Sequence, residues 1–149
     1  MSDSFWMAQA YELALAAKKQ SEIPVGAVLV SADGHLLGKG WNQVIQNKDP
    51  CAHAELIALR NGASHLDNYR LLKTTLYVTL EPCSMCAGAL VQARIERLVF
   101  ATRDFKAGAA GSVYNLLQGY PLNHQVQIDE GIMQKECANL LVDFFKERR

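Results

Sequence analysis

Apolar residues recur every three to four positions over the first twenty residues of the chain, which is the spacing of one helical face. Ser4 stands just before this pattern and is the candidate N-cap, because its hydroxyl can accept a hydrogen bond from a free backbone N–H. The chain is therefore expected to open with an amphipathic helix. The residues on its apolar face are Trp6, Ala10, Leu13, Ala14 and Ala17.

The pattern then changes to one that is typical of strands. Residues 25–30 are almost entirely apolar, and residues 36–41 form a second candidate strand. Asp33 and Gly34 stand between them, and this dipeptide is a strong signal for a tight hairpin turn. Residues 42–50 are mostly polar, so we expect a β-hairpin followed by a polar connection.

Helical and extended patterns alternate over the rest of the chain. Helices that alternate with strands are typical of an α/β fold with helices on both faces of one sheet. No internal repeat or linker interrupts the pattern, so residues 1–149 are expected to form one domain. The expected elements are helices at residues 52–60, 83–93 and 132–145, strands at 74–79, 98–101 and 126–128, and a loop at 103–111.

Charge and hydropathy limit the class of protein. The 149 residues include 15 Lys and Arg against 15 Asp and Glu, so the formal net charge is zero. This balance argues against indiscriminate binding to nucleic acids or anionic membranes, and any contact with nucleic acid needs a local basic patch. The N-terminus lacks the pattern of a secretory signal, and no stretch approaches the roughly 18 apolar residues of a membrane span. We therefore expect a cytoplasmic protein that makes no use of a membrane.

Two short segments contain the residue types that bind zinc. In a reducing compartment, cysteines serve as free thiols, metal ligands or catalytic groups. Cys83 and Cys86 lie one turn apart at the start of a predicted helix, where the positive end of the helix dipole favours thiolates. His53 stands near the start of another predicted helix and adds an imidazole. These three residues are the candidate ligands of one Zn²⁺ per chain.

The number of ligands indicates a catalytic site. Structural zinc sites are closed by four protein ligands, whereas catalytic sites keep one position for water, whose pKa falls to about 7 in favourable sites. Glu55 is the candidate catalytic residue, because one carboxylate beside the metal can take a proton from water and return protons to the substrate. Residues two apart share no helical face, so His53 and Glu55 can both approach the metal only at a helix N-terminus.

Each half of this pattern has a simpler explanation when taken alone. A single Cys-x-x-Cys can be a redox pair or half of a structural zinc site, and a single His-x-Glu usually lies on a surface helix. Both halves open predicted helices here, which favours the catalytic site.

The combination of His-x-Glu with Pro-Cys-x-x-Cys is the signature of zinc-dependent deaminases. Over nearly its whole length the sequence also resembles the family of bacterial tRNA-specific adenosine deaminases, which belongs to the cytidine deaminase-like superfamily. The run Gly-Ala-Ala-Gly-Ser at residues 108–112 and the Phe-Phe pair before a basic C-terminus are more specific to this family than the metal motif. The segments that carry the resemblance are residues 24–28, 40–42, 52–55, 76–83, 85–89, 103–104, 108–112, 123–124 and 144–145.

This resemblance implies a fold, a reaction and an assembly. The fold would be a three-layer α/β/α sandwich with a five-stranded mixed sheet. The reaction would be the hydrolysis of adenosine to inosine at the wobble position of a tRNA anticodon, chiefly in an arginine tRNA, with Glu55 as the proton shuttle. The enzyme would then be a hydrolase that acts on C–N bonds of cyclic amidines. It would form a homodimer in which both subunits touch each anticodon stem-loop.

The resemblance also implies contacts with the RNA. Asn42 would contact the flipped nucleotide, although a turn residue after the strand is an equally good interpretation. Asp104 would contact the neighbouring ribose, phosphate or base, or would simply cap its loop. Phe144 and Phe145 are adjacent and point apart, so at most one of them faces the core. The residues expected to help hold the anticodon loop are Asn123, Phe145, Arg148 and Arg149.

Two residues depart from the family pattern: Phe105, where relatives usually carry a small residue or Pro, and Cys51, where Thr is common. Two other functions are compatible with the zinc motif. One is a deaminase of free cytosine, guanine or a nucleoside, and the other is a zinc-stabilised RNA-binding module without activity. An anticodon loop is favoured as substrate because its bases are already partly unstacked and cost little to splay apart.

Overall fold

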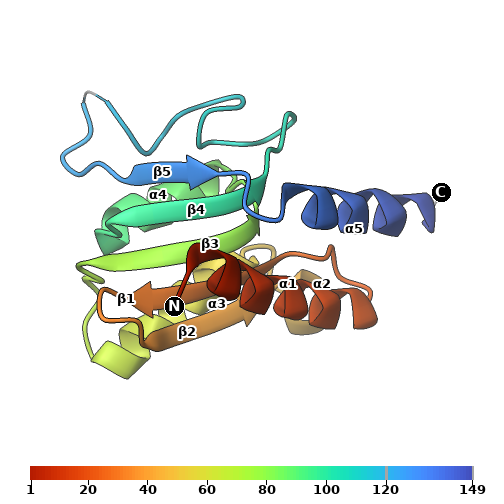
Figure 1. Ribbon diagram of the computed structural model, residues 1–149, viewed down its shortest axis with the longest axis horizontal. Helices are drawn as coiled ribbons and strands as arrows, with labels where there is room; N and C mark the ends of the chain where they lie inside the picture. Colours follow the sequence, from red (N-terminus) through yellow and green to blue (C-terminus); the bar gives the residue numbers. More distant parts are fainter. Residues whose placement is uncertain (120, 149) are drawn as a thin grey trace.

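The computed structural model describes residues 1–119 and 121–148, which form one mixed sheet with helices on both faces (Figure 1). The strand order is β2-β1-β3-β4-β5; β1 is antiparallel to both of its neighbours, and β3, β4 and β5 are parallel. The strands are β1 (Gly26–Ser31), β2 (Leu36–Trp41), β3 (Thr74–Leu80), β4 (Arg97–Thr102) and β5 (Gln127–Glu130). The helices are α1 (Asp3–Lys19), α2 (Val44–Asn47), α3 (Ala54–Leu66), α4 (Ser84–Ala93) and α5 (Gln134–Lys146).

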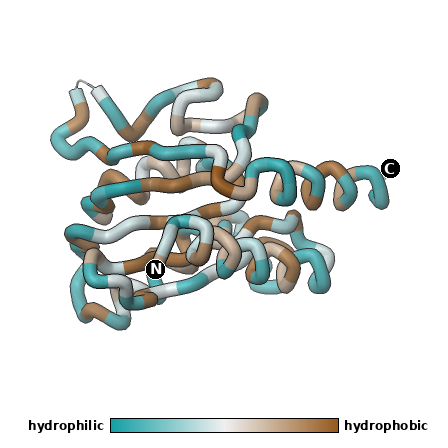
Figure 2. Tube along the Cα trace, viewed as in Figure 1, coloured by the Kyte–Doolittle hydropathy of each residue, from teal (hydrophilic) through white to brown (hydrophobic). Residues whose placement is uncertain are grey.

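Each face of the sheet buries its own apolar cluster. Helices α1 and α5 cover one face, and α3 and α4 cover the other (Figure 1). Alternate residues of β1 divide between the two clusters: Val28 packs with Trp6 under α1, whereas Leu29 packs with Leu90 under the other pair of helices. Figure 2 shows apolar residues along the inner strands and an alternation of polar and apolar residues along α5. The expected three-layer α/β/α sandwich with a five-stranded mixed sheet is confirmed.

The predicted elements form, although α3 continues to Leu66, six residues beyond its expected end at residue 60, and two further expectations need correction. Ser4 is not the N-cap of α1: the helix begins at Asp3, and Ser2 accepts the hydrogen bond from the backbone N–H of Phe5 at 3.2 Å. The helix begins earlier because Asp3 belongs to its first turn, where Arg97 holds the carboxylate. The second correction is that the connection after β2 contains the short helix α2.

Helix α3 approaches β2 closely because two residues of that strand are glycines. A Cβ atom at Gly40 would lie 2.5 Å from the carbonyl oxygen of Ala54, and one at Gly38 would collide with the backbone of Ala58. Any side chain at Gly40 would therefore push the start of α3 away from the sheet. Because His53 and Glu55 flank Ala54, this contact fixes the depth at which both side chains sit.

Candidate metal centre

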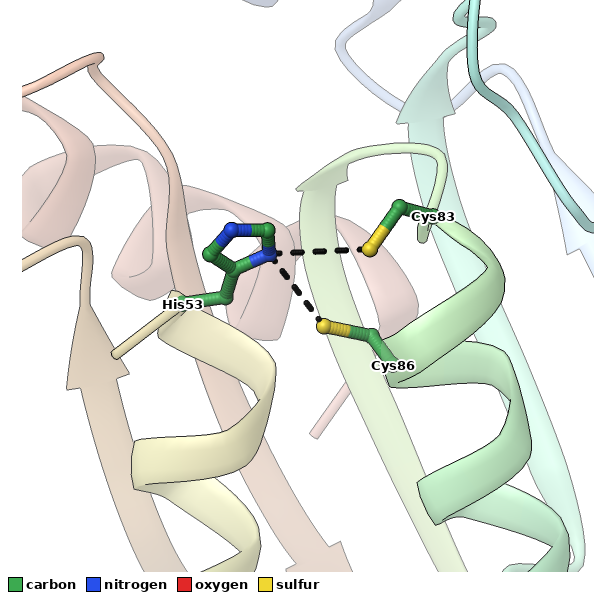
Figure 3. Close-up of side chains that lie close together, drawn as sticks. All are labelled: His53, Cys83 and Cys86. Atoms are coloured by element: carbon green, nitrogen blue, oxygen red, sulfur yellow. Dashed lines mark hydrogen bonds between the residues drawn. The ribbon is translucent and has the colours of Figure 1, made fainter. Parts of the chain in front are cut away.

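Two helices begin side by side at the carboxyl end of β3, and each begins with a residue of the predicted metal site. His53 is the N-cap residue of α3, and Cys83 is the N-cap residue of α4. Neither side chain forms a capping hydrogen bond to its own helix, so the imidazole and the sulfur can turn toward each other. Cys86 lies in the first turn of α4. Figure 3 shows all three side chains converging in the space between the two helices.

The distances among these side chains fit a tetrahedral zinc site. The Nδ1 atom of His53 lies 3.6 Å from the sulfur of Cys83 and 3.5 Å from the sulfur of Cys86. Zinc bonds of about 2.0 Å to nitrogen and about 2.3 Å to sulfur, at a tetrahedral angle, place the nitrogen about 3.5 Å from each sulfur. Within the described part of the chain, these are the three residues whose ligand atoms cluster within 4.8 Å of one another. The donor set therefore fits one zinc ion held by one imidazole and two thiolates.

The proton balance of the cluster favours a thiolate. A hydrogen bond from the thiol of Cys86 lowers the pKa of Cys83 to about 4, and the same contact raises the pKa of Cys86. The hydrogen bond with Cys83 also raises the pKa of His53 above its ordinary value. A cation that binds here meets one preformed thiolate and displaces the remaining protons, since metal ligands must be deprotonated.

Glu55 lies in the first turn of α3, directly after the N-cap residue His53 and Ala54. This is the helix N-terminus at which both side chains were expected to approach the metal. Its side chain is buried, with 4% of its surface exposed, and burial raises the pKa of its carboxyl group to about 7. A carboxyl group with a pKa near neutrality can both accept and return protons at physiological pH, which is the property that general acid–base chemistry needs.

The site opens into a cavity of about 200 Å³ with apolar walls formed by Ile23, Val25 and Leu80. Polar groups from four segments meet in this cavity. Among the predicted site residues, those that line it are Asn42, His53, Glu55, Cys83 and Asp104.

Asn42 is largely buried, and both ends of its amide are engaged. Its oxygen accepts a hydrogen bond from the backbone N–H of Ala54 at 2.9 Å, and its nitrogen donates to the carbonyl of Ile23 at 3.1 Å. The amide therefore positions the start of α3, which neither sequence-based interpretation of Asn42 included. Its predicted contact with the substrate stays a prediction, although its place in the cavity is compatible with one.

Asp104 acts as a loop cap, as one of its two interpretations held. Its carboxylate accepts hydrogen bonds from the backbone N–H groups of Lys106 at 3.0 Å and Ala107 at 3.1 Å. The turn that follows β4 is thereby closed beside the cavity.

Glu81 is a site residue that the sequence did not single out, although it directly precedes Pro82 and Cys83. It is 2% exposed, and its carboxylate accepts hydrogen bonds from the backbone N–H groups of Asp104 at 3.0 Å, Ala110 at 2.9 Å and Ser112 at 3.0 Å, as well as from the Ser112 hydroxyl. Burial raises the pKa of the Glu81 carboxyl group, but these hydrogen bonds together lower it by a larger amount. The pKa of Glu81 therefore lies below its ordinary value. One buried carboxylate thus ties the loop at residues 104–112 to the metal-site segment.

The remaining predicted contact residues within the described part of the chain do not line the cavity. The carbonyl of Asn123 accepts a hydrogen bond from the side chain of Arg94, the C-cap residue of α4, whereas Cys83 is the N-cap residue of that helix. On α5, Phe144 is buried and Phe145 is 44% exposed, which confirms that only one of the pair faces the core. Arg148 lies 3.7 Å above the ring of Phe144. Arg149 lies outside the described residues.

Helix α5 extends beyond the sheet at the end where β3 and β4 finish (Figure 1). Leu80 at the end of β3 and Asp104 just after β4 both line the cavity. No helix in the described part of the chain has the length and apolar character needed to cross a membrane.

Known proteins share this sequence and this arrangement. The family model of the cytidine and deoxycytidylate deaminase zinc-binding region matches residues 1–102. The tRNA-specific adenosine deaminase of Haemophilus influenzae is 52% identical over 147 residues, which are 99% of this chain and 85% of that protein.

Two solved structures extend the comparison to the fold. One comes from studies of A-to-I editing by tRNA:A34 deaminases at the wobble position; it has a TM-score of 0.88 and 36% identity, and the match covers 92% of this chain and 99% of that chain. The X-ray structure of guanine deaminase from Bacillus subtilis has a TM-score of 0.67 and 36% identity, over 74% of this chain and 71% of that chain.

Proposed function

Because this chain belongs to the cytidine and deoxycytidylate deaminase family, we propose that it is a zinc-dependent tRNA adenosine deaminase, which hydrolyses adenosine to inosine at the wobble position. The observation that carries the proposal is the cavity at the start of α3, where an imidazole faces two cysteine sulfurs and a buried carboxyl group lies beside them. The similarity to a wobble-position deaminase extends over nearly the whole chain, and supports tRNA as the substrate.

His53, Cys83 and Cys86 hold the zinc ion in this proposal, and Glu55 carries protons. Zinc, when bound, activates a water molecule by lowering its pKa toward 7. The carboxylate of Glu55 would accept a proton from water and return protons to a nitrogen of the purine ring and to the amino group that leaves as ammonia. Its buried position excludes bulk solvent, and its pKa of about 7 suits both transfers.

The size of the cavity suits a single base. Its volume of about 200 Å³ lies below the roughly 300–1,000 Å³ of typical small-molecule sites, so one base enters while the rest of the RNA stays outside. Anticodon bases are easily splayed apart, and the wobble adenosine can therefore reach the metal without the opening of a helix. In this proposal Asn42 and Asp104 contact this nucleotide, and their place in the wall of the cavity supports that role.

Residues beyond the cavity hold the remainder of the anticodon stem-loop in this proposal. Phe145 lies in the last turn of α5, which projects past the sheet, and the basic residues Arg148 and Arg149 follow the helix in the sequence. We assign arginine tRNA as the chief substrate from the family resemblance. Asn123 lies away from the cavity of its own chain, so it would meet RNA that is bound at the site of a second subunit.

A homodimer in the cytoplasm is the proposed working form. The outer side of α3 and α4 carries an apolar depression of about 360 Å³, lined by Leu56, Leu59, Tyr69 and Leu71 among others. Tyr69 is 71% exposed there. A second copy that covers this surface would remove apolar area from water and bring its own loops near the RNA. Light scattering at micromolar concentration tests this assembly: twice the mass of the chain supports it, and a monomer at every concentration contradicts it.

The experiment for the reaction compares an RNA substrate with free bases. The zinc-loaded protein is incubated with an anticodon stem-loop of arginine tRNA that carries adenosine at the wobble position, and inosine is measured by mass spectrometry. The same RNA with adenosine moved one position along the loop is the matched control. We expect inosine at the wobble position alone. Deamination of free guanine, cytosine or adenosine as fast as that of the RNA would overturn the tRNA assignment.

A further inference from the structure

Phe105 is the most exposed aromatic side chain in the described part of the chain, with 77% of its surface accessible. It lies in the loop after β4, between Asp104 and the nearby Ala107, which both line the cavity. Single exposed apolar residues are common on protein surfaces and need no function. Phe105 is different, because it stands in the sequence between two residues of the wall of the cavity that a base would enter.

The turn around Phe105 is closed by hydrogen bonds on both sides. The backbone N–H of Asp104 donates to the buried carboxylate of Glu81 at 3.0 Å. After Phe105, the N–H groups of Lys106 and Ala107 donate to the Asp104 carboxylate, and that of Gly108 donates to the Asp104 carbonyl at 2.9 Å. Phe105 is therefore presented from a fixed turn, which lowers the entropy that is lost when a ligand packs against its ring.

Lys106 adds a charge that suits the backbone of a nucleic acid. Its side chain is exposed, and within the described residues no carboxylate lies at ion-pair distance from its ammonium group. An aromatic ring next to a free cation is the combination that binds a base together with its phosphate.

When the wobble adenosine leaves the anticodon stack, the bases on either side lose a stacking partner. We propose that Phe105 stacks on one of the two bases that flank the target adenosine and that Lys106 contacts the adjacent phosphate; this rests on the proposed function. The ring replaces the stacking that the flipped base has withdrawn, so the cost of flipping falls. Phe105 thereby makes the reaction sensitive to the presence of a flanking base.

The test combines changes in the protein with changes in the RNA. kcat/KM is measured for the wild type, Phe105→Ala and Phe105→Tyr on three anticodon stem-loops: the intact RNA, one with an abasic site 5′ of the adenosine, and one with an abasic site 3′ of it. Phe5→Ala is the matched control, because Phe5 is a partly exposed phenylalanine in the first turn of α1, where Asp3 is bound by Arg97 at the start of β4, whereas Phe105 follows the end of that strand. Zinc content and melting temperature are measured for each variant.

On the intact RNA we expect Phe105→Ala to lower kcat/KM by about 10- to 100-fold, mainly through KM, while Phe105→Tyr and Phe5→Ala stay within about twofold of the wild type. On one of the two abasic RNAs, kcat/KM of the wild type should fall to the value that Phe105→Ala shows on the intact RNA. The same abasic site should not lower kcat/KM of Phe105→Ala any further. Two results would overturn the stacking role. One is a Phe105→Ala variant as active as the wild type. The other is that each abasic site lowers kcat/KM of Phe105→Ala by the same factor as it lowers that of the wild type, because the ring and the base would then act independently. Absence of inosine with the wild type on intact RNA would overturn the proposed function as well.

Discussion

The side-chain oxygen of Asn42 accepts a hydrogen bond from the backbone N–H of Ala54 at 2.9 Å. This N–H belongs to the first turn of α3 and has no partner within the helix, so it needs an acceptor from elsewhere. The N-cap residue of α3 is His53, whose ring faces the two cysteines and forms no capping hydrogen bond to its own helix. Asn42, directly after β2, thus satisfies the first free N–H of α3, while the ring of His53 is left to face the metal site.

Replacement of Asn42 by Ala should therefore loosen the segment that carries His53 and Glu55. We expect Asn42→Ala to lower the free energy of unfolding by about 1–2 kcal/mol, the usual cost of a lost cap, and to lower kcat by at least about tenfold. Asn61→Ala is the matched control, because Asn61 also joins α3 to the backbone of β2, at an exposed position. Urea unfolding and the inosine assay measure both effects. If Asn42→Ala is as stable and active as Asn61→Ala, the capping role is wrong.

Glu81 holds three backbone N–H groups of the loop at residues 104–112, and Gln is the sharpest replacement. The amide nitrogen of Glu81→Gln would face N–H donors with which it cannot bond. We expect a loss of about 2–3 kcal/mol in stability and a higher KM for the RNA, with zinc content unchanged. Glu96→Gln, at an exposed position before β4, is the control. If Glu81→Gln loses this stability but its KM for the RNA is unchanged, the loop at residues 104–112 does not contribute to RNA binding.

His53→Ala tests the link between zinc and folding. Loss of one of three protein ligands should lower the zinc content well below one ion per chain and lower the melting temperature, because metal affinity is coupled to folding. His65→Ala removes an exposed imidazole from the last turn of the same helix and should change neither value. Zinc is measured by atomic emission and stability by thermal unfolding. A His53→Ala protein with a full complement of zinc would refute its assignment as a ligand.

The pH dependence of stability should report the contact between Asp3 and Arg97. The two hydrogen bonds from Arg97, at 2.9 and 2.7 Å, lower the pKa of Asp3 below its ordinary value of 3.8. A carboxyl group with a lowered pKa stabilises the folded state above its ordinary pKa, and this contribution disappears as the pH falls through the lowered value.

We accordingly expect Asp3→Asn to be less stable than the wild type by about 1 kcal/mol at pH 7, with a smaller difference at pH 3. Asp143→Asn, which changes an exposed carboxylate on α5, should match the wild type at both values. Urea unfolding at the two pH values measures this. A difference that grows toward pH 3 would contradict the assigned direction.

Most of the fold follows from local patterns in the sequence. The five strands and four longer helices have apolar spacings that a short window can detect, and Asp33-Gly34 marks the turn between β1 and β2. Helix α2 escaped prediction because its start is fixed by Glu22, whose carboxylate accepts hydrogen bonds from the N–H groups of Ile45 and Gln46. Such a contact between distant residues leaves no periodic signal.

The same distinction applies to the site. The cluster of His53, Cys83 and Cys86 could be anticipated because zinc chemistry requires these residue types at short spacing near helix ends. The structural contacts of Asn42 and Glu81 could not, since their partners lie 12 to 31 residues away along the chain. What these side chains hold in place became visible only when the sheet brought the segments together.

The most direct test of the central claim is the amount of inosine formed by Glu55→Gln, measured together with its zinc content. Glu55 contributes no ligand atom to the metal cluster, so the variant should keep about one zinc ion per chain. Deamination of the wobble adenosine should fall by at least about 100-fold, the usual contribution of a general acid–base group. Glu12→Gln, at an exposed position on α1, is the control and should remain fully active. Full activity in zinc-loaded Glu55→Gln would contradict the proposed mechanism.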